Sequence, residues 1–442
     1  MVKLSLRVSI VLAGLVFLAA SLAAQVRNTA SWPHWRGPSH DGVAAGDVPL
    51  TWSDTSNVRW KIEIPGRGFS TPVIWGDRLF LTTAIPTGKK AEQPAAEGRG
   101  RAGGGSGAGE EHRLEVMAID RANGKVIWQE TATTTLPHEG YHQRYGSFAS
   151  NAPATDGQRL YAFFGSRGLF VYDLDGKLLW QKDLGLKMQM RLAFGEGTGT
   201  VVDDGRIYLQ FDHQGEGFVA ALNAADGKEL WRAPRNENSS WSTPLVAKHD
   251  GAKQLVVTAD TKVKAYDVNT GKVIWEVAGL GPNPIPQPVQ FRDMVLVMSG
   301  YRNPRLMAVR LGRTGDLTGT DAIVWETTRG TSYTASPALH DGRLYIIADN
   351  GMMSVFDAAT GTPHYLQQRL PQPYNFKASP LVVNDRVYLA TEEGDVVVVK
   401  TGNAFEVLAT NTVADQSFIA SPIAVDNQLF LRSRTHLFKI GG

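Results

Sequence analysis

The sequence predicts an all-β fold, an eight-bladed β-propeller with four antiparallel strands in each blade. Two repeated signals lead to this prediction. A hairpin with Gly in its turn and Trp in its second strand recurs every ~40–50 residues, and a short apolar strand preceded by Pro recurs with it. Because a closed ring of blades is one cooperative unit, the 442 residues are expected to form one propeller rather than several separate domains.

The hairpin is most complete at residues 265–275. Asp267 can accept hydrogen bonds from the turn amides, Gly271 tolerates a positive φ, and Trp275 lies in the strand that follows. A residue that recurs once in every unit is best explained by packing between neighbouring blades, rather than by stacking on a ligand. The corresponding residues are Trp60, Trp128, Trp180, Trp231, Trp275, Trp325, Tyr365 and, most weakly, Leu408.

Each blade is expected to begin with a short apolar strand that follows a small residue and Pro. Eight such strand starts occur, at Pro72, Pro153, residues 197–199, Pro244, Pro288, Pro337, Pro380 and Pro422. Trp60 has no strand start before it, and Pro422 has no closing hairpin after it. The strand around Trp60 is therefore predicted to complete the last blade, so that the N-terminal strand closes the ring and removes the open sheet edges.

The step from Trp60 to Trp128 is too long for one blade. The excess lies in residues 86–112, a stretch of Gly, Ala, Glu, Lys and Arg that cannot bury enough apolar surface to offset its ordering entropy. We expect a disordered insertion in the first blade. Its acidic and basic residues balance, which favours a solvated loop over a surface for acidic partners.

Residues 1–24 are typical of a secretory signal peptide. Lys3 and Arg7 precede an apolar run over residues 8–20, and small residues follow it. An uncleaved membrane anchor is the alternative, since the apolar stretch approaches the ~20 residues that span a bilayer. Cleavage would give a periplasmic or extracellular protein with no membrane span, in which residues 25–56 form a leader segment and 57–442 the propeller.

Composition excludes several further classes. The formal net charge of +2 is too small to indicate a nucleic-acid or membrane-surface partner. The chain has no cysteine, so it has no disulfide, no thiol metal site and no lipid attached through an N-terminal cysteine. A monomer is expected.

The repeat resembles the pyrroloquinoline quinone (PQQ) type of β-propeller. The tryptophan-docking motif of that family, A-x-D-x-x-T-G-x-x-x-W, is matched throughout by residues 265–275 and partly by the other copies. Residues 32–38 also resemble the leader of secreted bacterial proteins with such repeats. The resemblance spans nearly the whole mature chain and implies the fold more strongly than an activity.

Two kinds of protein share this repeat. Quinoprotein dehydrogenases bind PQQ and Ca²⁺ in the channel and oxidise alcohols or sugars, typically with an adjacent-cysteine disulfide. A periplasmic lipoprotein that assists outer-membrane barrel assembly keeps the ring and lacks the cofactor. Without cysteine, this chain departs from both patterns.

The sequence gives little evidence for catalytic groups. The acid pairs at Asp203 and Glu392 each stand beside a turn Gly, which indicates solvated hairpin tips. His138, His142 and His213 match no metal-binding spacing, although the loop that contains His138 and His142 could contribute to a ligand site. No catalytic residue, metal site or cofactor is predicted; PQQ with Ca²⁺ belongs to the alternative below.

The candidate binding site is a set of aromatic residues that precede the strand starts. If these strands are innermost, as the resemblance implies, the aromatics lie at one mouth of the channel and could grip a protein, peptide or glycan. Packing beneath neighbouring loops is the competing interpretation. The candidate residues are Phe69, Phe148, Trp241, Tyr333, Phe376 and Phe418, with Lys377 among them.

These observations favour a secreted, non-catalytic binding or scaffolding module. The alternative is a reduced PQQ-dependent quinoprotein oxidoreductase of the alcohol or sugar dehydrogenase type. Oxygen ligands that converge in the channel would indicate the enzyme, whereas an aromatic funnel would indicate the module.

Overall fold

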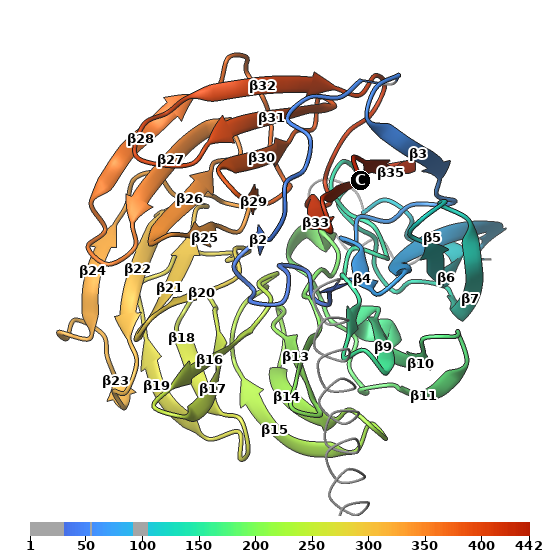
Figure 1. The fold of residues 1–442 in the computed structure, drawn as a ribbon. Helices are drawn as coiled ribbons and strands as arrows, with labels where there is room; N and C mark the ends of the chain where they lie inside the picture. The colour runs from blue at the N-terminus through green and yellow to red at the C-terminus, as the bar shows by residue number, and fades with distance from the viewer. Residues whose placement is uncertain (1–30, 54, 92–104) are drawn as a thin grey trace, which may run out of the picture.

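The computed structural model describes residues 31–53, 55–91 and 105–442. Eight sheets surround a central channel, which confirms the eight-bladed propeller (Figure 1). The helical segments in these ranges are two short 3-10 turns, Gly165–Arg167 and Arg191–Ala193. No helix in the described part is long and apolar enough to cross a membrane. The predicted signal peptide, residues 1–24, lies outside the described residues.

Each blade is an antiparallel sheet that runs from the channel to the rim. Blade 1 contains β4 (Val73–Trp75), β5 (Arg78–Lys90), β6 (Glu110–Asp120) and β7 (Val126–Thr135). Blade 2 contains β8 (Ala154–Thr155), β9 (Arg159–Phe163), β10 (Leu169–Asp173) and β11 (Leu178–Lys182). Blade 3 contains β12 (Val201–Asp203), β13 (Arg206–Phe211), β14 (Gly217–Asn223) and β15 (Glu229–Arg235). Blade 4 contains β16 (Leu245–His249), β17 (Ala252–Val257), β18 (Val263–Asp267) and β19 (Val273–Val277).

The second half of the ring repeats this order. Blade 5 contains β20 (Val289–Phe291), β21 (Met294–Ser299), β22 (Arg305–Arg310) and β24 (Ile323–Thr327). Blade 6 contains β25 (Ala338–His340), β26 (Arg343–Ile347), β27 (Met352–Asp357) and β28 (Pro363–Arg369). Blade 7 contains β29 (Leu381–Val383), β30 (Arg386–Ala390), β31 (Asp395–Lys400) and β32 (Val407–Thr412). Blade 8 contains β33 (Ile423–Val425), β34 (Gln428–Arg432), β35 (His436–Ile440) and β3 (Val58–Glu63).

The last blade is shared by the two ends of the chain. β3 pairs antiparallel with β35 and supplies the outermost strand of blade 8. Trp60 on β3 donates its indole N–H to the Arg121 carbonyl of blade 1 at 3.2 Å. The predicted closure of the ring by the N-terminal strand is confirmed.

Trp128 shows how neighbouring blades dock. A Cβ added to Gly176, in the turn of the next blade, would lie 2.8 Å from the Trp128 ring, and the indole N–H donates to the Leu174 carbonyl at 3.0 Å. Trp231 makes the equivalent hydrogen bond to the Val268 carbonyl at 2.9 Å. These aromatic residues therefore pack between blades, as their periodicity predicts.

Trp275 differs from the other docking residues. It is fully buried, and its indole N–H donates to the Gln254 side chain of its own blade at 2.6 Å. Blade 5 reaches back over it, because β23 (Gly315–Asp316) pairs in parallel with β19. The most complete copy of the motif thus has the most enclosed tryptophan.

The predicted insertion, residues 86–112, has strand structure at both ends. β5 continues to Lys90 and β6 begins at Glu110, and these two residues pair with each other. Ser106 forms a bridge with Tyr141, exchanging two backbone hydrogen bonds of 2.9 and 3.1 Å. Extended pairing satisfies backbone groups that a solvated loop would leave to water, so these ends belong to the blade. Residues 92–104 lie outside the described residues.

Candidate functional site

Residues 31–44 of the predicted leader segment occupy the channel (Figure 1). β1 (Ser31–Trp32) pairs with the last residues of β4, and β2 (Val43–Ala44) pairs with β29. Further backbone hydrogen bonds join the segment to blades 2, 6 and 7: Thr155 N–H to the Pro33 carbonyl at 3.0 Å, Leu339 N–H to the Asp41 carbonyl at 2.9 Å, and Val382 N–H to the Gly42 carbonyl at 2.9 Å. We call residues 31–44 the channel plug.

Arg36 anchors the channel plug from inside. Its side chain is 1% exposed, and one of its guanidinium nitrogens donates to the Pro337 carbonyl at 3.0 Å. Burial lowers the pKa of Arg36 to about 10, so the group stays charged at neutral pH. Gly42 has a φ of +75°, and a Cβ there would lie 1.9 Å from the guanidinium, so a side chain at this position would be strained and would displace Arg36.

Two histidines of the channel plug stack on each other. The ring centroids of His34 and His40 lie 4.6 Å apart. Burial lowers the pKa of both imidazoles, that of His40 to about 4, and the neighbouring His40 lowers the pKa of His34 further. Both rings are therefore neutral at pH 7.

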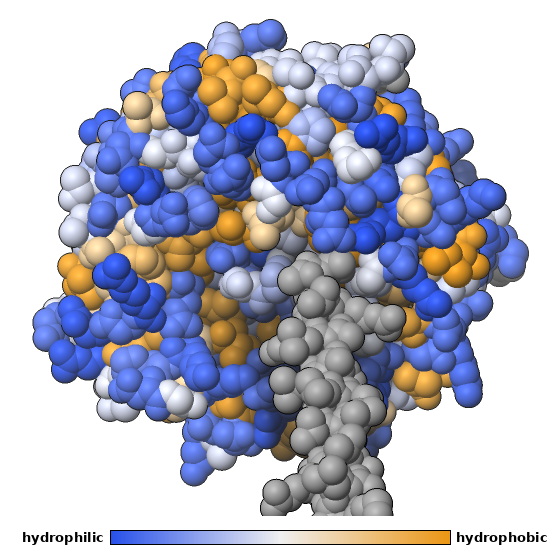
Figure 2. Space-filling model, in the orientation of Figure 1, coloured by the Kyte–Doolittle hydropathy of each residue, from blue (hydrophilic) through white to orange (hydrophobic). Residues whose placement is uncertain are grey.

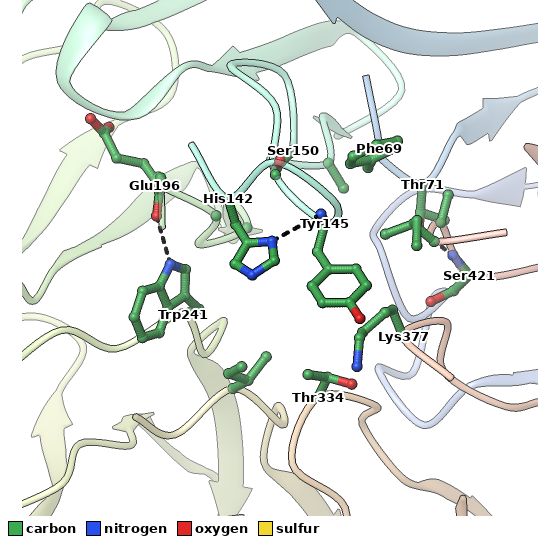
Figure 3. A pocket seen from close by; sticks show the side chains of 18 of the residues that line it. Phe69, Thr71, His142, Tyr145, Ser150, Glu196, Trp241, Thr334, Lys377 and Ser421 are labelled. Carbon is green, nitrogen blue, oxygen red and sulfur yellow. Dashed lines mark hydrogen bonds between the residues drawn. The ribbon is translucent and has the colours of Figure 1, made fainter. Parts of the chain in front are cut away.

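One mouth of the channel holds a pocket of about 290 Å³, which we call the mouth pocket (Figure 3). Trp35 of the channel plug is one of its lining residues, so the plug reaches the pocket. The rest of the lining comes from loops that precede the innermost strands. The aromatic rings that line it are Trp35, Phe69, His142, Tyr145, Phe194, Trp241 and Tyr333.

The structure divides the seven predicted site residues. Phe69, Trp241, Tyr333 and Lys377 line the mouth pocket. The other three do not reach it: Phe148, Phe376 and Phe418 are 5%, 0% and 0% exposed and belong to the apolar cores between blades. Both interpretations of the aromatic set thus apply, each to a different part of it. That the four pocket residues bind a ligand stays a prediction.

Several pocket residues were not among the predicted ones. His142 and Tyr145 come from the loop between β7 and β8, where clustered aromatic and histidine residues were the only signal. Trp35 belongs to the leader, which has no repeat to show where it lies. Neither position follows the period of the blades, so periodicity could not identify them.

The hydroxyl groups before the strand starts link neighbouring blades around the mouth. Ser379 accepts the Ser336 N–H at 2.9 Å, Ser421 accepts the Ser379 N–H at 3.0 Å, and Thr71 accepts the Ser421 N–H at 3.1 Å. Each N–H is buried, so the hydroxyl supplies a partner that water cannot. This pattern explains why Ser or Thr recurs beside the Pro of the strand starts.

Charged residues surround Tyr145 on one side of the pocket. The Lys377 ammonium lies 4.6 Å from the Tyr145 ring centroid and 2.6 Å from an Asp349 carboxylate oxygen (Figure 3 shows Tyr145 and Lys377 side by side). Arg144 pairs with Glu392 at 3.0 Å.

The Glu392 carboxylate corrects the prediction of a solvated hairpin tip. Its side chain is 1% exposed, because Arg144 approaches it from the connection between blades 1 and 2 and Lys377 from the connection before its own blade, and burial raises its pKa. The other predicted tip is more open: Asp204 is 70% exposed, although Lys253 binds both it and Asp203.

The residues present do not fit PQQ with Ca²⁺. That site needs aromatic and cationic groups together with several converging oxygen ligands. The pocket has the rings and Lys377, but its one acidic lining residue is Glu196, which accepts the Ser166 N–H at 2.5 Å and pairs with Arg167 at 3.0 Å. Within the described ranges no group of three His, Cys, Asp or Glu side chains could hold a metal ion.

The closed ring and its docking tryptophans define a β-propeller of the PQQ-like class, and the comparisons agree. The chain belongs to the family described as outer membrane protein assembly factor BamB, whose model matches residues 43–182, 112–283 and 284–433. It is 24% identical to BamB of Yersinia pestis over 337 residues, 72% of this chain and 78% of that protein. It is also 23% identical to tetrathionate hydrolase of Acidithiobacillus ferrooxidans, over 83% of this chain and 72% of that protein.

Solved structures share the architecture at low identity. Quinohemoprotein alcohol dehydrogenase of Comamonas testosteroni has a TM-score of 0.66 at 11% identity, covering 94% of this chain and 81% of that one. A europium-containing methanol dehydrogenase has a TM-score of 0.64 at 10% identity, covering 92% and 89%. These similarities show the fold alone.

Proposed function

We propose that this protein is a non-catalytic binding module of the periplasm or extracellular space, which holds a segment of a partner protein in the mouth pocket. The observation that supports this most directly is the channel plug. Because Trp35 lines the pocket, the channel plug adds an aromatic ring to the surface that a ligand meets.

The lining suits side chains of a partner protein. Trp241 and Tyr333 are half-buried, so they offer rigid apolar area that a ligand can still cover. Buried aromatic anchors of this kind supply most of the binding energy at protein interfaces. The family description, an assembly factor for outer membrane proteins, favours a protein partner over a glycan.

The alternative function is a reduced quinoprotein oxidoreductase. Its support is the shared fold of the dehydrogenases, which carries no information about the site at 10–11% identity. The commitment of Glu196 to Arg167 and Ser166 leaves too few oxygen ligands at the pocket for Ca²⁺.

A calorimetric screen of peptides and glycans on the mature protein tests the proposal. We expect a peptide ligand whose binding weakens by more than about 2 kcal/mol when Trp241 and Tyr333 are both replaced by Ala. Replacing Leu178 and Leu179 on the outer rim by Ala is the matched control and should leave the affinity unchanged. Equal affinity in all three proteins would place the site elsewhere.

A further inference from the structure

We propose that the mouth pocket selects a peptide segment in which an aromatic side chain stands beside a carboxylate. This rests on the proposed function and names the chemistry of its ligand. The basis is an uneven distribution of charge around the pocket: Lys377 lines one side, where three arginines pack against the lining rings Phe69 and Tyr145, and Trp241 lies on the other.

Four cations from four connections gather at this side of the mouth, and we call them the cationic wall; Lys377 is the one that lines the pocket. Arg67 precedes blade 1, Arg144 lies between blades 1 and 2, Lys377 precedes blade 7, and Arg434 lies in the turn between β34 and β35. Arg67 and Arg434 approach the Phe69 ring to 5.2 and 5.6 Å, and Arg144 approaches the Tyr145 ring to 5.4 Å. The pocket-lining rings thus hold these four cations close together.

Two of the four cations have no carboxylate partner among the described residues. Arg67 donates to the carbonyls of Gly146 at 2.9 Å and Gln143 at 2.5 Å, and Arg434 donates to the Arg144 carbonyl at 2.8 Å. The carboxylates of Asp349 and Glu392 are already paired with Lys377 and Arg144. The wall therefore keeps a net positive charge that an acidic ligand can neutralise.

Neighbouring groups respond to this charge. Burial lowers the pKa of His142, and Lys377, Arg144 and Arg67 lower it further. Burial also lowers the pKa of Arg434. The neighbouring Arg67 and Arg144 lower it further, while Glu392 acts in the opposite direction. A cation is disfavoured here, so a basic ligand would be rejected.

The opposite wall is formed mainly by apolar rings, and its one acidic residue, Glu196, is already paired with Arg167. Trp241 lies there, across the pocket from Lys377 (Figure 3), with Phe194, Ile285 and Tyr333 also in the lining. The indole N–H of Trp241 already donates to the Gly195 carbonyl at 2.7 Å, so this wall offers its ring face rather than a donor. A ligand with a ring and a carboxylate would satisfy both walls at once.

The carboxylate could belong to an Asp or Glu side chain or to the end of a peptide chain. Four probe peptides separate these sources: acetyl-Gly-Glu-Phe-Gly-amide, acetyl-Gly-Gly-Phe with a free terminal carboxylate, acetyl-Gly-Gly-Phe-amide and acetyl-Gly-Lys-Phe-Gly-amide. Binding to the mature protein is followed by calorimetry and tryptophan fluorescence at low ionic strength. We expect at least one acidic peptide to bind about tenfold more tightly than the neutral and basic ones.

Arg434→Gln removes one cation without leaving a carboxylate unpaired. It should weaken binding of the acidic peptide about three- to tenfold and leave the neutral peptide unchanged. Arg59→Gln, on the exposed outer strand of the same blade, is the matched control and should change neither. Thermal melts show that both variants are folded.

Equal binding of acidic and neutral peptides would overturn this inference while leaving the mouth as the binding site. Tighter binding of the basic peptide, or no binding of any of the four, would also overturn it. Loss of all peptide binding in the Trp241→Ala, Tyr333→Ala protein tests the proposed function separately, because that pair carries no charge.

Discussion

The outer docking residues and the mouth aromatics both recur about once per blade, yet they differ in what they contact. Trp128 and Trp231 have their indole N–H groups bound to the next blade, and their rings cover its turn glycine. At the mouth, Trp241 and Tyr333 keep part of their rings open to a pocket, whereas Phe376 and Phe418 are fully buried. Periodicity alone therefore identifies a position in the ring, and burial decides its role.

Some exposed apolar residues lie on the described rim strands. Val126, Ile127, Leu178 and Leu179 on the outer strands of blades 1 and 2 are 43–50% exposed. On the face shown in Figure 2 the apolar residues form separate patches between hydrophilic ones. Scattered exposed apolar residues are usual for a protein surface, whereas a pocket lined by several aromatic rings is a candidate binding site.

The largest expected effect concerns the docking ring. Trp275→Ala should lower the free energy of unfolding by about 3–5 kcal/mol, because it empties a fully enclosed site. Trp241→Ala, which removes a half-buried ring, should cost clearly less. Denaturant titration of both variants measures the difference, and equal losses would mean that the two aromatic sets do not differ in role.

The hydroxyl links around the mouth should contribute less. Thr71→Val keeps the shape but removes the acceptor of the buried Ser421 N–H, so the free energy of unfolding should fall by about 1–3 kcal/mol. Thr71→Ser keeps the acceptor and is the control. If both variants unfold at the same denaturant concentration, the hydroxyl does not join the blades.

Acid should loosen the channel plug. Burial lowers the pKa of His40 to about 4 in the folded protein, whereas the ordinary value is ~6.5. Between these two pH values the unfolded chain therefore binds a proton that the folded chain does not. Stability is therefore lost as the pH falls from ~6.5 towards 4, by up to about 3 kcal/mol. Thermal melts at pH 7 and pH 5 should show a smaller acid loss for His40→Gln than for the natural protein; an identical loss would contradict this.

No effect is expected from PQQ. Titration of the mature protein with PQQ and Ca²⁺ should give no micromolar binding and no dye-linked oxidation of alcohols or sugars, because the pocket lacks the oxygen ligands. Binding at about −8 kcal/mol or better, with turnover that depends on the cofactor, would show that the enzyme alternative is right.

The ring could be predicted because its signals repeat. The docking residues and strand starts gave the number of blades, and the unmatched Trp60 gave the closing strand. Trp35 and Glu392 could not be placed, because their positions depend on single contacts between distant segments. The channel plug pairs with β4 and β29 through backbone groups, and Glu392 is buried by Arg144 from another blade; neither leaves a pattern in the sequence.

Hydrogen exchange locates the ligand most directly. The mature protein is compared with and without the probe peptide that binds most tightly, and amide protection is read for the mouth loops, residues 138–150 and 373–379, and for the rim strands β7 and β11. We predict slower exchange in the mouth loops and no change in the rim strands. Protection confined to β7 and β11, with unchanged mouth loops, would contradict the central claim that the mouth pocket is the binding site.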